Sequence, residues 1–131
     1  MKLNKIFILL LFAFQSCISS FSEKSINIDN LENQNSTLNY QIKVGEKISF
    51  TTSVHGSVGM AADYEILDSK ILKLEDSKII YDNPNFEGTG GDGGMKKFVF
   101  KGLSTGKTKV TIKKIYRGEL QKKIILEVEV L

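Results

Sequence analysis

Residues 95–112 read MKKFVFKGLSTGKTKVTI, and this stretch decides how the fold of the chain is interpreted. Phe98 and Phe100 alternate with lysines, residues 104–106 have the composition of a turn, and Val110 resumes the alternation. A period of two residues places apolar side chains on one face of a β-strand and polar side chains on the other. The stretch therefore predicts two strands joined by a tight turn.

The same alternation begins at Tyr40 and continues to the end of the chain, and no window shows a helical period of any length. Strands are expected at residues 40–44, 48–52, 60–67, 71–74, 79–81, 98–103, 110–115 and 124–131. Short strands with turns every eight to twelve residues are typical of an immunoglobulin-like sandwich. The expected fold is therefore all-β, an immunoglobulin-like Greek-key β-sandwich of seven to eight strands. A small barrel is the competing architecture.

Residues 1–22 are interpreted as a signal peptide. Two lysines precede an apolar run at residues 6–14, and the segment contains no acidic residue. Such a run is too short to cross a bilayer, which needs about 20 apolar residues. Ser20 and Ser22 suit a signal peptidase, whereas the residues before Cys17 loosely resemble a lipoprotein box. We expect a protein that is secreted or held in an endolysosomal or vesicular compartment, or alternatively a cell-envelope protein with a lipid on Cys17.

Composition limits the classes of partner. Cys17 is the only cysteine, so the exported domain has no disulfide and depends on its core. Loss of Lys2 and Lys5 with the signal peptide reduces the 18 basic residues to 16, against 15 acidic ones. A charge this close to zero gives no electrostatic reason to bind nucleic acid or an anionic membrane. No membrane-spanning segment is expected in the mature chain, which is predicted to be a monomer.

Residues 23–39 are rich in asparagine and serine and are expected to form a polar N-terminal arm. Asn35 begins an N-glycosylation sequon, which makes it a possible modification site in a eukaryotic source. The sandwich domain is expected to cover residues 40–131.

The sequence offers little material for an enzyme or a metal site. His55 is the only histidine, which excludes a histidine-rich metal site, and a Cys–His nucleophile is excluded because the mature chain has no cysteine. No carboxylate lies beside His55 in the sequence to suggest a catalytic triad. Calcium needs six to eight oxygen ligands, and only Asp82 and Glu87 lie near Asp92. We expect no catalysis, no metal and no cofactor.

Three loops carry the remaining information. They are VHGSVGM at 54–60, GTGGDGGMKK at 88–97 and YRGEL at 116–120. In a Greek-key sandwich the connections that they occupy gather at one end, where loops on a rigid scaffold form a binding surface. For the glycine-rich stretch, the alternative is a long hairpin loop with no partner. Tyr116 could equally point into the core.

The order of these loops resembles the chagasin family of cysteine-protease inhibitors. That family shows Asn-Pro-Thr-Thr-Gly, then Gly-x-Gly-Gly, then Arg-Pro followed by an aromatic residue. The second motif is matched in full by Gly91, Asp92, Gly93 and Gly94. The first is reduced to Gly59, after His55, Gly56, Ser57 and Val58 at the preceding positions. The third is reduced to Tyr116 and Arg117, followed by Gly118 and Glu119 in place of proline and the aromatic residue.

The resemblance implies a reversible inhibitor that plugs the active-site cleft of papain-like cysteine proteases. The first loop, His55 to Met60, would lie across the catalytic pair, and the second and third loops would grip the walls. Val58 or Met60 would supply an apolar contact and Arg117 a charged one. Because two motifs are degraded, weaker or differently selective inhibition is expected. The alternative of another class is a surface immunoglobulin-like adhesion or ligand-binding module without protease inhibition.

Overall fold

The computed structural model describes residues 23–31, 37–85 and 92–131, so Cys17, Asn35 and Gly91 lie outside the described residues. Within these ranges it contains eight strands and two short 3₁₀ helices. They are β1 (Glu23–Asn27), η1 (Ile28–Asn30), β2 (Thr37–Ile42), β3 (Lys47–His55), η2 (Gly56–Val58), β4 (Met60–Ile66), β5 (Leu72–Tyr81), β6 (Gly93–Gly102), β7 (Gly106–Tyr116) and β8 (Glu119–Val130). None of the described helices is long and apolar enough to span a bilayer.

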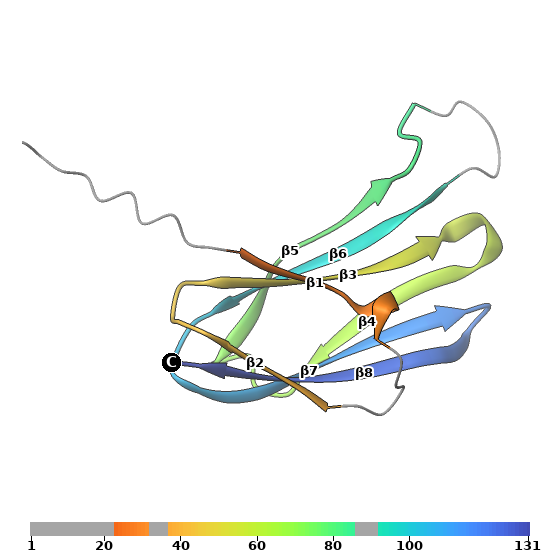
Figure 1. The fold of residues 1–131 in the computed structure, drawn as a ribbon. Coiled ribbons are helices and arrows are strands. Elements are labelled where there is room, and N and C mark those ends of the chain that lie inside the picture. The colour runs from red at the N-terminus through yellow and green to blue at the C-terminus, as the bar shows by residue number, and fades with distance from the viewer. Residues whose placement is uncertain (1–22, 32–36, 86–91) are drawn as a thin grey trace, which may run out of the picture.

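The strands form two layers (Figure 1). One layer has the order β1-β3-β6-β5 and the other β2-β8-β7-β4. In the described strands the layers are joined by a single backbone pairing, between His55 of β3 and Met60 of β4. The expected β-sandwich is therefore confirmed in preference to a small barrel.

The core lies between the layers and is built from alternate residues of the four central strands. Phe98 and Phe100, the aromatic pair of the stretch at 95–112, are both buried. Phe50 packs against Phe100 with ring centroids 5.9 Å apart, and Tyr64 of β4 reaches across from the other layer to Phe98 at 5.4 Å. Buried aromatic side chains contribute large apolar areas, and tilted ring pairs add to that burial. Four aromatic rings thus fix the spacing of the two layers.

One expected pair of strands is a single strand. The apolar segments 71–74 and 79–81 belong to the continuous β5, which pairs with β6 and carries a bulge between Leu74 and Asp76. The polar residues between the two apolar segments suggested a break. They are tolerated because β5 is the edge strand of its layer, and its last seven residues are exposed on both faces.

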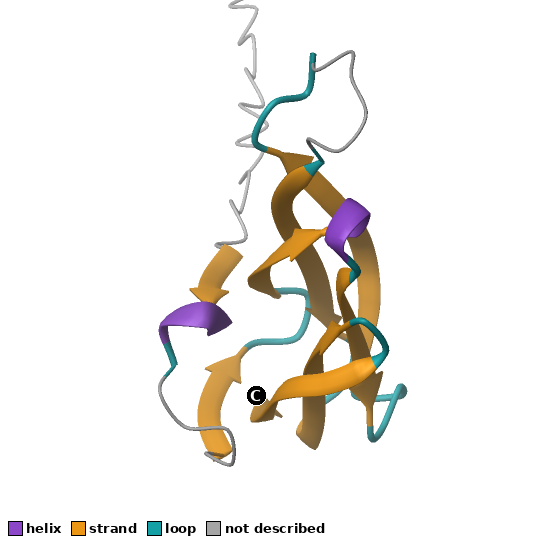
Figure 2. Ribbon diagram, turned by 90° about the vertical axis from the view of Figure 1, so that its right-hand side faces the viewer, coloured by secondary structure: helices purple, strands orange, loops and turns teal. Residues whose placement is uncertain are grey.

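The segment expected to be a polar arm contributes to the sandwich where it is described. β1 pairs in parallel with β3 at the edge of one layer, and β2 pairs in parallel with β8 at the edge of the other. Between them, Ile28 of η1 is 0% exposed and belongs to the core. Figure 2 shows η1 at the side of the sandwich, away from η2. The N-terminal segment therefore closes one side of the sandwich.

Asp29 fixes this segment to both layers. Its carboxylate accepts hydrogen bonds from Thr52 Oγ1 (2.7 Å) and Ser53 N (2.7 Å) of β3, and from Lys114 Nζ (3.1 Å) of β7. Lys122 Nζ of β8 donates to the carbonyl oxygen of Ile28 at 2.9 Å. Partial burial alone would raise the pKa of Asp29, but the hydrogen bonds to its carboxylate outweigh burial and hold the pKa below its usual value.

Replacing Ile28 with alanine should destabilise the whole domain, because the side chain fills the core and its removal leaves a cavity. We expect Ile28→Ala to lower the free energy of unfolding by about 2–5 kcal/mol in urea denaturation. Ile80→Ala is the control, since Ile80 is 51% exposed and should change stability by less than about 1 kcal/mol. Equal stability of the two variants would show that the N-terminal segment is not part of the folded unit.

Candidate functional site

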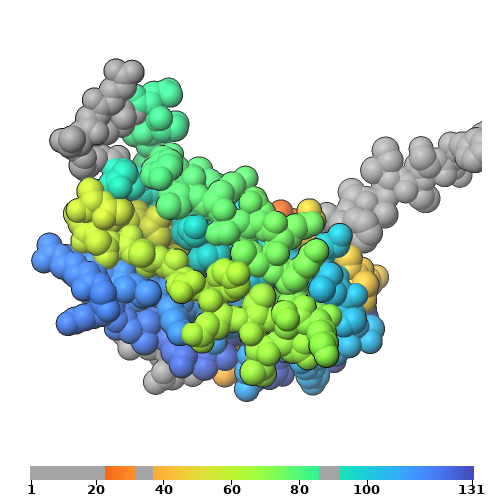
Figure 3. All heavy atoms as spheres, turned by 180° about the vertical axis from the view of Figure 1, so that it is seen from behind, coloured from red at the N-terminus to blue at the C-terminus, as the bar shows by residue number. Residues whose placement is uncertain are grey.

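The described parts of the three predicted loops lie at one end of the sandwich. The first loop, η2 and Gly59, connects β3 to β4, and the third, Arg117 and Gly118, connects β7 to β8. The second loop, predicted at residues 88–97, is described from Asp92 onward, and Asp92 stands directly before β6 in the connection from β5. Figure 3 shows the first loop in yellow, the start of β6 in cyan and the β7–β8 turn in blue at the same end.

The first and third loops are joined through their backbones. The N–H of Arg117 donates to the carbonyl oxygen of Gly59 at 2.8 Å, and Met60 pairs with Tyr116 where β4 meets β7. Gly59 has a φ of 79°, a left-handed conformation that suits glycine. It ends η2 and turns the chain toward the second layer. The bond to Arg117 therefore forms where the chain changes layers.

The third loop is a two-residue hairpin turn with positive φ at both positions, 50° at Arg117 and 83° at Gly118. This is the pattern of a type I′ turn, which favours asparagine or glycine at the first position. An arginine in the left-handed region costs about 1–2 kcal/mol. The Arg117 guanidinium carbon lies 5.1 Å from the ring centroid of Tyr116, and Arg117 itself is exposed. The turn thus holds a cation at the tip despite an unfavourable backbone.

The first and second loops are joined by Asp92. The N–H of Ser57 donates to both carboxylate oxygens of Asp92, each at 3.1 Å. A Cβ atom on Gly56 would lie 2.7 Å from Asp92 Oδ2, so a larger residue at position 56 would make the carboxylate move. The hydrogen bonds from Ser57 hold the pKa of Asp92 below its usual value. Asp92 is therefore a charged clamp on the first loop.

His55 adds a polar contact to this clamp. Its Nδ1 atom lies 3.1 Å from Ser57 Oγ and 3.6 Å from Asp92 Oδ1. A catalytic triad needs the carboxylate and the hydroxyl on different ring nitrogens, whereas here both face the same one. This geometry links loops and differs from that of a proton relay. Among the described residues, no group of three His, Cys, Asp or Glu side chains could hold a metal ion.

Gly93 and Gly94 lie in β6, and Gly94 differs from the rest of the predicted site because it is buried. A Cβ atom on Gly94 would lie 2.5 Å from the carbonyl oxygen of Ile80, so a larger residue would push β5 and β6 apart. Gly94 thus serves the strand pairing. Tyr116 is half-buried and is not one of the residues of the hydrophobic core.

The sequence interpretation missed an apolar recess beside the first two loops. It has a volume of 280 Å³ and is lined mainly by apolar side chains of β3, β4 and β5. These include Val54, Met60, Ala62, Ile79 and Tyr81, while Lys96, Gly56 and Asp92 lie at its polar parts. The detectable signal in the sequence is the run Ile79-Ile80-Tyr81, which places apolar residues on both faces of an edge strand.

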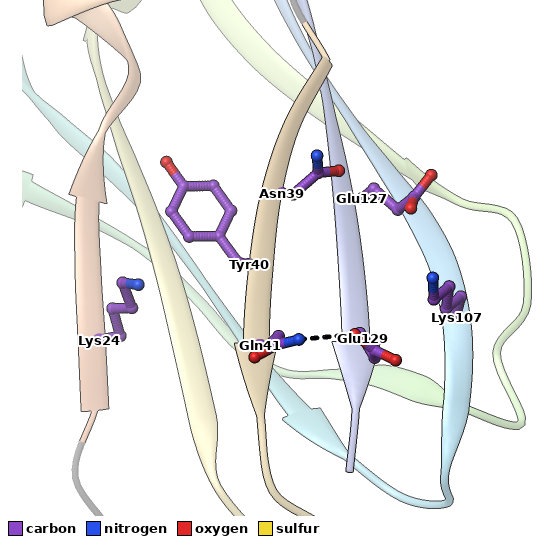
Figure 4. Close-up of a pocket in the computed structure, with 7 residues that line it drawn as sticks. All are labelled: Lys24, Asn39, Tyr40, Gln41, Lys107, Glu127 and Glu129. Carbon is purple, nitrogen blue, oxygen red and sulfur yellow. Dashed lines mark hydrogen bonds between the residues drawn. The ribbon is translucent and has the colours of Figure 1, made fainter.

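A second hollow, of 590 Å³, lies at the edge where β2 pairs with β8 (Figure 4). Its lining is mostly polar, and its groups already interact: Gln41 Nε2 donates to Glu129 Oε2 at 2.8 Å, and Lys24 Nζ lies 4.8 Å from the ring centroid of Tyr40. Polar and charged groups that already have partners in this way are typical of a solvated face. The loop end is therefore the stronger candidate for a binding site.

Replacing Asp92 with alanine should release the first loop without unfolding the domain. We expect Asp92→Ala to remove the exchange protection of the Ser57 amide, measured by hydrogen exchange, with little change in melting temperature. In the unsubstituted chain the protection should persist as pH falls through about 3.8 and disappear only below the lowered pKa of Asp92. Asp82→Ala, in the same loop, is the control and should leave the Ser57 amide protected. Protection that survives Asp92→Ala would contradict the clamp.

Comparison with known proteins gives matches in structure alone. No family model matches the chain, and no curated protein matches it in sequence. Among solved structures, the cysteine protease inhibitor EhICP2 from Entamoeba histolytica has a TM-score of 0.64 at 15% identity, over 83% of this chain and 96% of that one. Amebosin has a TM-score of 0.59 at 19% identity, over 84% of this chain and 99% of its own.

A third structure, PbICP-C in complex with falcipain-2, has a TM-score of 0.57 at 16% identity, over 82% of this chain and 99% of that one. At these identities the likeness establishes a shared fold. The fold of this chain is therefore one that cysteine protease inhibitors have, as the resemblance to the chagasin family predicts.

Proposed function

We propose that this protein is a reversible inhibitor of papain-like cysteine proteases that enters the active-site cleft with the three loops at one end of its sandwich. The observation that carries the proposal is the pair of links from the first loop, Ser57 N to Asp92 and Gly59 O to Arg117 N. A loop that such links hold in place before binding loses less conformational entropy when it binds. The structural likeness to EhICP2 and to PbICP-C supports the same function.

The shape of the first loop suits a narrow cleft. Its tip, Gly56 to Gly59, is exposed, and two of its four residues are glycines that let a partner approach the backbone closely. Val58 is 41% exposed at the tip and offers an apolar contact, while Met60 at its base is half-buried. In the proposed complex this loop lies across the catalytic Cys–His pair of the protease.

The second and third loops would contact the walls of the cleft. Binding hot spots favour Trp, Tyr and Arg, and this chain has no tryptophan. Arg117, over the ring of Tyr116, is the strongest candidate anchor of the third loop. With so few anchor residues, we expect weaker or differently selective inhibition than in a protein with all three motifs intact.

Export belongs to the same proposal. Cleavage of the signal peptide after Ser22 would deliver a monomeric, soluble inhibitor outside the cytosol, and cleavage before Cys17 would instead leave the inhibitor with a lipid on that residue. Non-catalytic binding also fits an exported domain with one histidine and no cysteine after residue 22.

The direct test is inhibition of papain and of a cathepsin L-like protease by residues 23–131. We expect inhibition at or below micromolar concentration, with full recovery of protease activity on dilution and an inhibitor that remains uncleaved. Absence of inhibition across a panel of such proteases would overturn the proposal. Specific binding of a glycan or matrix ligand without protease binding would favour the adhesion module instead.

Arg117→Asn separates binding from stability. Asparagine tolerates positive φ better than arginine, so the melting temperature should stay the same or rise, while loss of the cation should raise the inhibition constant for papain about 10-fold. Lys123→Asn, a change of the same type at an exposed position of β8, is the control and should leave the constant unchanged. Equal inhibition by the two variants would mean that the third loop does not contact the protease.

A further inference from the structure

The apolar recess lies at the loop end, between the last residues of β5, the first residues of β6 and the start of β4. β3 and β4 pair at His55 and Met60, and Met60 also lines the recess. In antiparallel sheets, directly paired residues share a face. Ile79 pairs with Lys96, and Tyr81 pairs with Gly94. Lys96 and Gly94 lie two and four positions before the buried Phe98 on β6, so they are on the same face of the strand as Phe98. Ile79 and Tyr81 therefore lie on the inner face of their layer.

These two inner-face side chains are not covered. Ile79 is 38% exposed and Tyr81 is 46% exposed, whereas Phe98 and Phe100, inner-face residues further along the neighbouring β6, are buried. Exposed apolar surface beside a polar rim marks an interaction site more often than chance. The recess is thus an unfilled continuation of the core that opens to solvent.

Its size and lining indicate one kind of occupant. The volume of 280 Å³ is below the range of about 300–1,000 Å³ typical of sites for whole small ligands, and it suits one large side chain. Val54, Met60 and Ala62 supply the opposite apolar wall. Lys96, whose Nζ lies 5.5 Å from the ring centroid of Phe98, keeps its charge at the edge of the recess.

We propose that this recess receives one large apolar side chain, such as Leu, Met, Phe or Trp, from the wall of the bound protease. This inference rests on the proposed function. Its main support is continuity: Gly56 and Met60 of the first loop and Asp92 of the second also line the recess. A partner that contacts these two loops must cover the mouth of the recess. Anchoring of a large side chain in such a pocket is how protein interfaces gain most of their affinity.

Ile79→Ser and Ile80→Ser form the matched test. The two residues are neighbours of similar exposure, but Ile79 lines the recess and Ile80 lies on the opposite face of β5. We expect Ile79→Ser to raise the inhibition constant for papain at least about 10-fold and Ile80→Ser to change it less than about 2-fold, with similar melting temperatures. Equal constants with an active unsubstituted chain overturn this inference alone. An unsubstituted chain that does not inhibit overturns the proposed function as well.

A second measurement does not depend on inhibition. Residues 23–131 contain no cysteine, so Ile79→Cys and Ile80→Cys can each carry one environment-sensitive fluorophore. Addition of papain should shift the emission to shorter wavelength at position 79 and leave position 80 unchanged. No shift at position 79 on binding would overturn the inference. A shift that appears without papain and grows with protein concentration would mean that a second copy fills the recess, and would overturn it too.

Discussion

The backbone pairing of His55 with Met60 is the point on which the arrangement of this molecule depends. It is the one position in the described strands where the backbones of the two layers pair with each other, and the first loop forms directly beyond it. Everywhere else the strands of the two layers are held together by the side chains between them. The pairing lies at the loop end, where a loop tip, its hydrogen-bonding neighbours and an apolar recess lie within one small region.

The strands were predictable from the sequence where apolar and polar residues alternate regularly, and were not predictable elsewhere. β7 and β8 bury alternate residues, so Val110 stands out from the lysine and threonine beside it. β3 and β6 each bury three consecutive residues, and their pattern was still readable because Phe50, Phe98 and Phe100 are large and apolar. The N-terminal segment contributes isolated apolar residues among asparagines, and Ile28 gives no period of its own. Its place is set by hydrogen bonds from Thr52 and Lys114, residues distant in sequence. The continuity of β5 was hidden for another reason, because an edge strand can be polar on both faces.

The candidate site was predictable as three loops that gather at one end of the sandwich, and the contacts that join those loops were not. Turn composition and motif spacing locate the loops, since both are local properties. The hydrogen bond from Ser57 to Asp92 joins residues that are 35 positions apart. No local pattern predicts the recess as a whole, because its lining comes from four strands that are spread along the sequence. Gly94 shows that a motif can also mislead. It belongs to the predicted binding motif, but its close contact with the backbone of Ile80 gives it a structural role in the sheet.

The link between Gly59 and Arg117 uses backbone atoms alone. A contact of this kind places few demands on the identity of the side chains around it, so residues at the tips of the first and third loops can change while the loops keep their positions. The identity of the tip residues is in this sense separable from the position of the loops that carry them.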